Sequence, residues 1–197
     1  MKVLLATKNK GKIKDFEKLT EGMDLEVVTI LDGLEIPDVV EDGETFEENS
    51  RKKAKEIADY TNIVTISDDS GLCVDALDGG PGVYSARFGG ENATDSEKNQ
   101  KMLELLKDVK KENRKAHFVS VVSIAFPNGE IHSFRGEIKG EILFEARGNN
   151  GFGYNPIFYS YELGKSFGEA DDEERKSVSH RARAFRKLIA SGLLEEK

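Results

Sequence analysis

The sequence predicts an α/β fold with a long mixed central sheet flanked by helices. In the first half of the chain, short apolar runs alternate with segments of helical periodicity, which is typical of strand–helix–strand crossovers. From residue 116 the pattern changes to two long runs rich in Val, Ile and Phe around a Pro-Asn-Gly turn, which indicates an antiparallel hairpin. No internal repeat or linker-like tract interrupts the chain, so we expect a single domain over residues 1–197.

The first elements are a strand and a helix. Residues 3–6 form a short apolar run, and apolar residues then recur at helical spacing from residue 13 to 19. Thr7 or Asn9 can cap this helix because both side chains carry an oxygen that accepts a backbone N–H. Residues 25–30 predict a second strand.

A second helix is expected over about residues 45–60. Thr45 and Glu48 have the spacing of a capping box, which marks its start. Residues 63–66 then read as a short buried strand that ends at the Ser-Asp-Asp-Ser-Gly sequence of residues 67–71. The stripe of the helix expected to be buried consists of Phe46, Ala54, Ile57 and Ala58.

The later elements follow the same two periodicities. A helix is expected over residues 94–109, a hairpin of strands over 116–126 and 130–138 with its turn at 127–129, and a last helix from Ser179 to a stop near Gly192. The apolar residues expected to pack from the two helices are Met102, Leu103, Leu105 and Leu106, and Ala182, Phe185, Leu188 and Ile189.

Composition excludes several classes of protein. The 29 basic and 37 acidic side chains give a net charge of −8, which argues against a protein that coats nucleic acid. No apolar run is long enough for a signal peptide or a membrane span, so we expect a soluble cytoplasmic protein with no membrane partner. One Cys and three His exclude an internal disulfide and a structural zinc site of the usual kind.

Adjacent carboxylates make Asp68 and Asp69 the first candidates for chemistry. Two acids at the end of a buried strand repel each other unless a cation lies beside them, and Mg²⁺ prefers oxygen ligands of this kind. The alternative is a solvated turn in which Asp, Ser and Gly serve only the backbone. Further acids surround the start of the second helix, and one of them could complete a metal site: Glu41, Asp42, Glu44, Glu47 and Glu48.

A lysine-rich loop at residues 7–12 is the second candidate site. It joins a strand to a helix, where backbone N–H groups and the helix dipole favour phosphate, although an exposed cap would look the same. No Walker motif and no GxGxxG fingerprint is present. Other cations in polar or glycine-containing segments are Lys53, Arg175, Lys176, His180 and Arg181.

The third candidate is the glycine-rich aromatic loop of residues 147–158. Rings between flexible glycines suit a loop that closes over a flat ligand such as a nucleobase. A plain aromatic turn in the core is one alternative, and an echo of the RNP1 motif of RNA-binding domains is another. Against the RNP1 interpretation, the leading cation is absent and Pro156 would interrupt a central strand.

Six motifs, in order along nearly the whole chain, resemble the inosine-triphosphate pyrophosphatase family. The resemblance implies a homodimeric α/β enzyme with two lobes and an active-site cleft between them. Its reaction would be Mg²⁺-dependent hydrolysis of ITP, dITP and XTP to the monophosphate and pyrophosphate, which removes damaged purines from the nucleotide pool. The motifs are residues 6–12, 41–49, 68–71, 79–82, 151–156 and 179–181.

The resemblance also implies roles for single residues. Asp69 would be the catalytic carboxylate, and Glu41, Asp68 and Asp69 would hold the metal. Thr7, Asn9, Lys12 and Lys53 would bind the triphosphate, Phe152 and Tyr154 would hold the base, and His180 and Arg181 would contact the purine. The full set of implied substrate-binding residues is Thr7, Lys8, Asn9, Lys10, Gly11, Lys12, Lys53, Ser70, Phe152, Gly153, Tyr154, Asn155, Arg175, Lys176, His180 and Arg181.

Departures from the family pattern suggest a difference in specificity. The family usually has Asp where this chain has Asn155, and Lys where it has Arg175. A carboxylate only accepts hydrogen bonds, whereas an amide also donates and so tolerates the bare N1 of adenine. We therefore expect weaker discrimination against ATP. The alternatives to this enzyme are a related Maf-type pyrophosphatase and a non-catalytic nucleotide or RNA binder.

Overall fold

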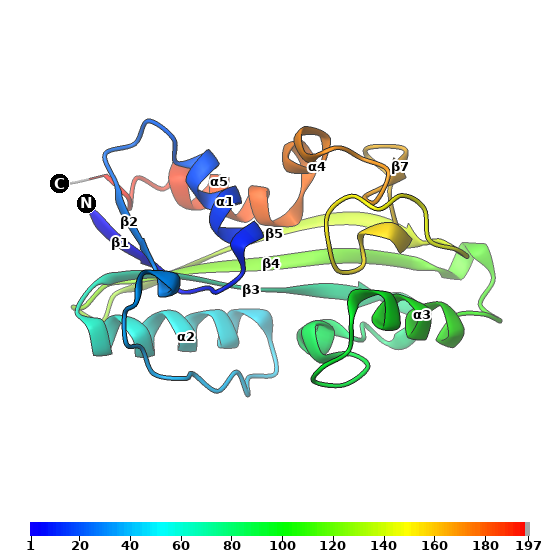
Figure 1. Cartoon of the computed structure of the whole chain (residues 1–197), viewed down its shortest axis with the longest axis horizontal. Helices are drawn as coiled ribbons and strands as arrows, with labels where there is room; N and C mark the ends of the chain where they lie inside the picture. The colour runs from blue at the N-terminus through cyan, green and yellow to red at the C-terminus, as the bar shows by residue number, and fades with distance from the viewer. Residues whose placement is uncertain (196–197) are drawn as a thin grey trace. The chain divides into compact units, whose positions relative to one another are not determined.

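The computed structural model describes residues 1–195 and contains a mixed seven-stranded sheet with the order β2-β1-β3-β4-β5-β6-β7 (Figure 1). Strand β1 runs parallel to both β2 and β3, whereas β6 runs antiparallel to β5 and β7. The predicted mixed sheet is confirmed. The strands are β1 Lys2–Leu5, β2 Glu26–Thr29, β3 Val64–Val74, β4 Lys115–Ala125, β5 Ile131–Ile142, β6 Phe158–Ser160 and β7 Lys165–Ser166.

Helices flank this sheet, and their starts follow the predicted caps. Asn9 caps the first helix, and Thr45 and Glu48 form the predicted capping box at the start of the second. Gly192 takes a positive φ of 74° just after the last helix, as a helix stop requires. The helices are α1 Lys10–Leu19, α2 Phe46–Thr61, α3 Asp95–Leu105, α4 Asp172–Val178 and α5 His180–Ala190.

The chain groups into two compact units. The first unit contains residues 1–69, 120–136 and 181 onward, and the second contains residues 70–119 and 137–180. The single domain and the cleft between lobes stay predictions. None of the helices over residues 1–195 is long and apolar enough to cross a membrane.

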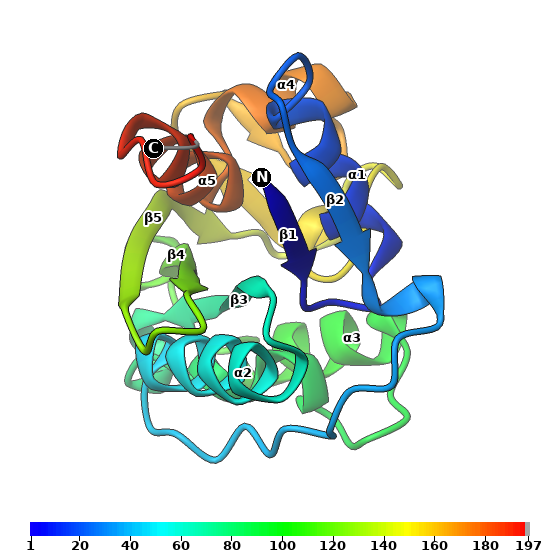
Figure 2. The same ribbon diagram turned by 90° about the vertical axis from the view of Figure 1, so that its left-hand side faces the viewer.

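In the first unit, helices cover both faces of the sheet. Figure 2 shows α1 and α5 on one face and α2 on the other. Successive residues of β1 point to opposite faces: Leu5 packs with the ring pair Phe16 and Phe185, whose centroids lie 5.1 Å apart, whereas Leu4 packs with Ile57 of α2. Burial on both faces explains the continuous apolar run of this strand.

The core of the second unit is aromatic. The Phe118 ring lies 4.5 Å from that of Phe158 and 5.9 Å from that of Phe167, measured between centroids. Met102 and Leu106, at the end of α3, complete the same cluster. Aromatic pairs at these separations stabilise a core beyond the area that they bury.

The predicted end of α3 at residue 109 is wrong, because the helix ends at Leu105 and that side chain is 51% exposed. The buried guanidinium of Arg114 explains the early stop. It donates to the carbonyl of Leu106 and, at 3.2 Å, to that of Val109, so these carbonyls are satisfied outside a helix. It also donates at 2.8 Å to each of two carbonyls at the end of β5, those of Ile142 and Leu143.

Two further expectations about elements need correction. Strand β3 does not end at residue 66 but continues to Val74. Leu72 and Val74 are buried in the core of the second unit, and the polar residues before them form hydrogen bonds or ion pairs. Helix α4 was not predicted, although Asp171 and Glu174 form a capping box at its start. Its seven residues contain no fully buried side chain, so no apolar stripe marks it.

Candidate active site

Strand β3 gives Asp68 and Asp69 separate surroundings. As successive residues of a strand, they point toward opposite faces of the sheet. Asp68 Oδ2 lies 2.8 Å from Lys12 Nζ of α1 and 3.6 Å from Arg181 Nε of α5. Asp69 Oδ2 instead accepts a hydrogen bond from the side-chain amide of Asn49 in α2, at 3.1 Å. Both carboxylates are buried, so the solvated turn considered as an alternative is excluded.

Cations dominate the environment of Asp68. Burial by itself would raise the pKa of this carboxyl, but Lys12, Arg181 and Lys53 outweigh that effect and lower the pKa to about 2. Asp15 also contacts Arg181, with its Oδ2 lying 3.5 Å from Arg181 Nη1. Asp68 is therefore ionised and already neutralised by protein side chains.

Asp69 has the opposite electrostatic character. Burial raises the pKa of its carboxyl, and the neighbouring charge of Asp68 acts in the same direction, against the lowering effects of Asn49 and Lys53. A carboxylate with a raised pKa is a stronger base. This is the buried acid in the first unit that is better suited to accept a proton.

Asn49 connects Asp69 to the loop before α2. Its Nδ2 donates to Asp69, while its Oδ1 accepts the N–H of Gly43 at 2.7 Å. The Gly43 backbone lies so close to α2 that a Cβ on it would be 2.7 Å from Asn49 Oδ1 and 2.8 Å from Glu48 Cβ. This position therefore requires glycine. No role for Asn49 was predicted, and its position one turn into α2 is the one sequence signal that could have indicated it.

Lys53 lies among the acids of the first unit. It pairs with Glu41, and it interacts electrostatically with both Asp68 and Asp69. Burial lowers the pKa of its ammonium, and nearby Lys12 lowers it further, whereas the two aspartates raise it. The ammonium marks a position where positive charge is favoured.

The donor set fits a magnesium ion with two carboxylates. Across the described residues, no three His, Cys, Asp or Glu side chains gather in a way that would hold a metal by themselves. Glu41 and Asp69 both interact with Lys53, and Mg²⁺ commonly takes one or two carboxylates with water and phosphate oxygens as its other ligands. Asp68 is paired with Lys12 and Arg181 in this structure, and its role as a third metal ligand stays a prediction.

The loop before α1 is held by its own caps. Asn9 Oδ1 accepts the N–H groups of Gly11 at 2.9 Å and Lys12 at 3.3 Å, and Thr7 Oγ1 accepts the N–H of Asn9 at 3.1 Å. Three of the backbone N–H groups at this helix start are thus used inside the loop. Lys8 and Lys10 are exposed at the start of the helix and carry the positive charge of this loop.

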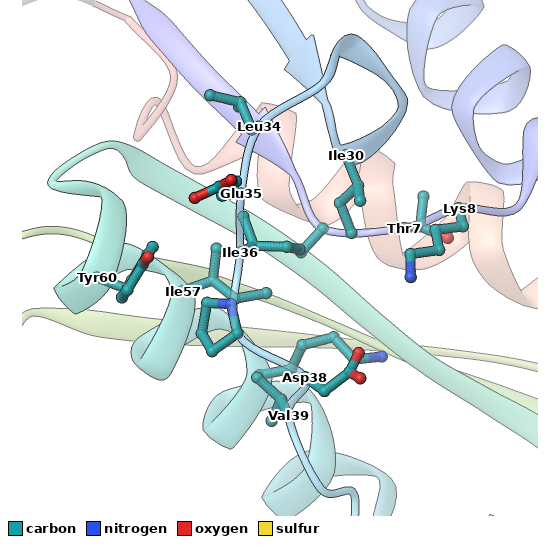
Figure 3. A pocket seen from close by; sticks show the side chains of 13 residues that line it. Thr7, Lys8, Ile30, Leu34, Glu35, Ile36, Asp38, Val39, Ile57 and Tyr60 are labelled. Atoms are coloured by element: carbon teal, nitrogen blue, oxygen red, sulfur yellow. The ribbon is translucent and has the colours of Figure 1, made fainter.

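A cavity of about 770 Å³ opens beside the lysine-rich loop. In Figure 3, Thr7 and Lys8 lie at one end and Tyr60 of α2 lies at the other. Lys53 also lines this cavity, so three of the predicted substrate-binding residues share one opening, and two of them, Thr7 and Lys53, are predicted to bind the triphosphate. The apolar part of the wall consists of Ile30, Leu34, Ile36, Pro37, Val39 and Ile57.

In the second unit, the aromatic loop presents one ring and buries the other. Phe152 is 47% exposed, whereas Tyr154 belongs to the core and donates its hydroxyl to the carbonyl of Ser85 at 2.7 Å. Tyr154 therefore does not offer its ring as the sequence suggested. Residues 155–157 form a 3-10 turn, so the strand that an RNP1 motif requires is absent there. Phe152 and Gly153 also line a cavity of about 590 Å³ with α3.

Of the remaining predicted residues of the second unit, Asn155, Arg175 and Lys176 lie in this loop and in α4, whereas Ser70 lies on β3. Asn155 and Arg175 flank Gly151, and the Arg175 guanidinium donates to the carbonyls of Phe167 and Ala170 and pairs with Asp172. Ser70 and Lys176 are half-buried.

His180 and Arg181, which the resemblance treats as a pair, have different surroundings. The His180 ring stacks on Phe118 with centroids 4.8 Å apart and planes 12° from parallel. Arg181 instead reaches Asp68 and Asp15. A purine contact by Arg181 is therefore not supported by its present position, which is among the carboxylates of the first unit.

Known proteins match this chain in sequence and in structure over nearly all of its length. A model of the Ham1 family matches residues 3–191. A protein named dITP/XTP pyrophosphatase from Desulforamulus reducens is 47% identical over 96% of this chain and 94% of its own, and one from Bacillus anthracis is 48% identical over 94% and 93%. The solved structure of a HAM1 protein from Coxiella burnetii superposes with a TM-score of 0.91 at 36% identity, covering 97% of this chain and 98% of that one. The Ham1 protein of Staphylococcus aureus gives 0.90 at 40% identity over the whole of both chains.

Proposed function

The chain belongs to the Ham1 family, and we propose that it hydrolyses dITP, ITP and XTP to the nucleoside monophosphate and pyrophosphate. It is a nucleoside-triphosphate pyrophosphatase, as the resemblance to the inosine-triphosphate pyrophosphatases led us to expect. Its relatives are named for dITP and XTP. The proposed role is to remove damaged purine nucleotides from the pool.

The different environments of Asp68 and Asp69 carry this proposal. Burial raises the pKa of Asp69, and Asn49 holds the orientation of its carboxylate. In the proposed reaction, a water oxygen forms a bond to the α-phosphorus as the bond to the bridging α–β oxygen breaks. Asp69 accepts the proton of that water, and pyrophosphate leaves with the bonding electrons.

Charge on the phosphates is matched by cations of the first unit. We assign Lys12 and Lys53, with Thr7, Lys8, Asn9, Lys10 and Gly11, to the triphosphate. Asp68 then acts as a positioning residue, because its ionised carboxylate fixes Lys12 and Arg181 in the folded protein. Cations held before substrate arrives need no reorganisation during the reaction.

The resemblance further supports Mg²⁺ as the cofactor, with Glu41 and Asp69 as its protein ligands. When bound, Mg²⁺ supplies positive charge that neutralises the phosphates and makes the α-phosphorus more electrophilic. Lys53 would then shift from Glu41 toward the phosphates, since it already interacts with the same carboxylates.

We assign the recognition of the purine base to residues of the second unit. Phe152 is the exposed ring of the aromatic loop and suits stacking against a purine. Gly153 and Tyr154 hold that loop, while Ser70, Asn155, Arg175, Lys176 and His180 supply polar groups. We assign Arg181 to the phosphates, because its ion pair with Asp68 holds it among the cations of the first unit. The resemblance also supports a homodimer that works in the cytoplasm, and sedimentation at micromolar concentration tests the dimer.

The decisive substrate experiment is pyrophosphate release from dITP, ITP, XTP, dATP and dGTP, each with Mg²⁺ and with EDTA. We expect fast release from the first three with Mg²⁺ only. Glu41→Gln should raise the Mg²⁺ concentration at half-maximal rate by about tenfold, whereas Glu44→Gln, in the same loop, should not. If no triphosphate is hydrolysed, a nucleotide or RNA binder is favoured, and salt-dependent RNA titration then tests that alternative.

A further inference from the structure

Helix α3 binds both backbone groups of Gly153. The Gly153 N–H donates to Asp95 Oδ2 at 2.7 Å, and Asn99 Nδ2 donates to the Gly153 carbonyl at 3.0 Å. Asp95 and Asn99 stand four residues apart, so they lie on the same face of the helix. Two adjacent side chains thus bind the two sides of one residue.

Gly153 stands between the two aromatic residues of the loop. Its φ of +64° is the left-handed conformation that glycine adopts without strain. On its far side, Tyr154 is fixed by its hydroxyl bond to Ser85 and by burial in the core. With Gly153 and Tyr154 both held, Phe152 is the exposed ring at the tip, and its direction follows from the backbone on which it stands.

Asn99 is poorly explained as a residue selected for stability. It is 8% exposed, and within residues 1–195 its Oδ1 has no hydrogen-bond partner. A buried acceptor without a donor lowers the stability of the folded state, and a leucine of similar volume would avoid this cost. Among residues 1–195, the hydrogen bond of this side-chain amide is to Gly153, which points to a use other than stability.

We propose that Asp95 and Asn99 are positioning residues that hold Phe152 in place for the purine base of the substrate. The proposal rests on the proposed function and deepens it: α3, which carries none of the predicted site residues, sets how strongly the base is bound. The phosphates do not take part, so the effect is confined to ligands that carry a base.

Four variants test this arrangement in the full-length protein. Asn99→Leu and Asp95→Ala each remove one hydrogen bond, and we expect each to raise the KM for dITP by about tenfold, as expected for a weakened base stack, with kcat changed less than about twofold. Asp95→Asn keeps an oxygen that accepts the Gly153 N–H, so its KM should stay at the wild-type value. Thr94→Ala removes the cap of the same helix without touching Gly153, and its KM should also be unchanged.

Inorganic tripolyphosphate provides a control without a base. Its inhibition constant should be the same in wild type and Asn99→Leu, because the phosphate groups do not contact Phe152. An inhibition constant that rises in parallel with the KM for dITP would overturn the proposal, since it would indicate general damage to the site. Unfolding by urea should show that Asn99→Leu is at least as stable as wild type.

A second measurement does not depend on activity. The chain contains no tryptophan, so Phe152→Trp creates a single reporter at the tip of the loop. In that background, Asn99→Leu and Asp95→Ala should raise acrylamide quenching by about twofold because the loop is released, whereas Asp95→Asn and Thr94→Ala should not. Unchanged quenching and unchanged KM in both Asn99→Leu and Asp95→Ala would overturn the proposal. A wild type that does not hydrolyse dITP overturns the proposed function instead, and quenching alone then decides whether α3 holds the loop.

Discussion

The amide of Asn49 donates to Asp69 Oδ2 at 3.1 Å and, through its own oxygen, accepts the N–H of Gly43 at 2.7 Å. One side chain, 2% exposed, thus fixes both the proposed base and the loop that carries Glu41. The bond to the carboxylate is not local in the sequence, since Asn49 and Asp69 stand 20 residues apart. The proposed base therefore has a defined orientation before any ligand is bound.

Replacing Asn49 by leucine should lower kcat by about tenfold to a hundredfold, because a small displacement of a catalytic group has a large effect on rate. The KM for dITP should change much less. Steady-state kinetics on Asn49→Leu, with Glu47→Gln on the exposed face of α2 as the matched control, checks this. A variant with wild-type kcat would show that the Asn49 hydrogen bond does not position the base.

Asp68 should make stability depend on pH. Its pKa is lowered to about 2 in the folded protein, below the ordinary value of 3.8, so its contribution is present above about pH 4 and is lost as the pH falls toward 2. The contribution at pH 7 is about 2 kcal/mol. Urea unfolding of wild type and Asp68→Asn should differ by that amount at pH 7 and converge near pH 2.

The control for this pH series is Asp59→Asn, at an exposed ion pair with Lys55. Exposed pairs contribute little, so this variant should follow wild type within about 0.5 kcal/mol at every pH. If the free energy of unfolding of Asp68→Asn stays parallel to that of wild type from pH 7 to pH 2, the assignment of a paired, ionised Asp68 is contradicted.

Arg114 should be important for folding and not for chemistry. Its buried guanidinium donates to four carbonyls, those of Leu106, Val109, Ile142 and Leu143. Arg114→Met removes the guanidinium donor from all four bonds, so we expect a loss of about 3 kcal/mol or more in the free energy of unfolding. Thermal unfolding checks the loss, and Arg87→Met, a surface substitution, should be nearly neutral. An Arg114→Met protein as stable as wild type would contradict this role.

Asn155→Asp should sharpen discrimination against adenine. An amide can donate to the bare N1 of adenine, whereas a carboxylate cannot, and Arg175 beside Gly151 would keep the new carboxylate ionised. We expect the ratio of kcat/KM for ITP over ATP to rise by about fivefold or more. Competition between the two nucleotides measures the ratio directly. An unchanged ratio would show that residue 155 does not determine the discrimination between ITP and ATP.

The elements that could be predicted from the sequence are those whose signals are local. The Thr45 and Glu48 capping box, the Asn9 cap and the turn before Gly129 each depend on residues a few positions apart. The apolar stripes of α1, α2 and α5 were likewise visible in the spacing, and the structure buries them in the first unit.

What the sequence could not reveal depends on partners far along the chain. Strand β3 continues through Asp68 and Asp69 because Lys12, Arg181 and Asn49 meet them, which no local propensity for strand or turn predicts. The early end of α3 likewise depends on Arg114.

The same limit applies to the candidate site. Adjacent acids after an apolar run made Asp68 and Asp69 candidates together, and only the family resemblance singled out Asp69 as the proposed base. The different role proposed for Asp68 required its cation partners. Asn49, Asp95 and Asn99 act through hydrogen bonds to residues 20 or more positions away, so their residue types alone gave no sign of a role.

Attack at the α-phosphorus with Asp69 as the base is tested by hydrolysis of dITP in ¹⁸O-labelled water by wild type and Asp69→Asn, with Asp59→Asn as the control. We expect the label to enter dIMP and not pyrophosphate, and we expect Asp69→Asn to lose the activity by about a thousandfold or more while Asp59→Asn retains it. Label in pyrophosphate, release of inorganic phosphate, or an active Asp69→Asn enzyme would contradict attack at the α-phosphorus with Asp69 as the base.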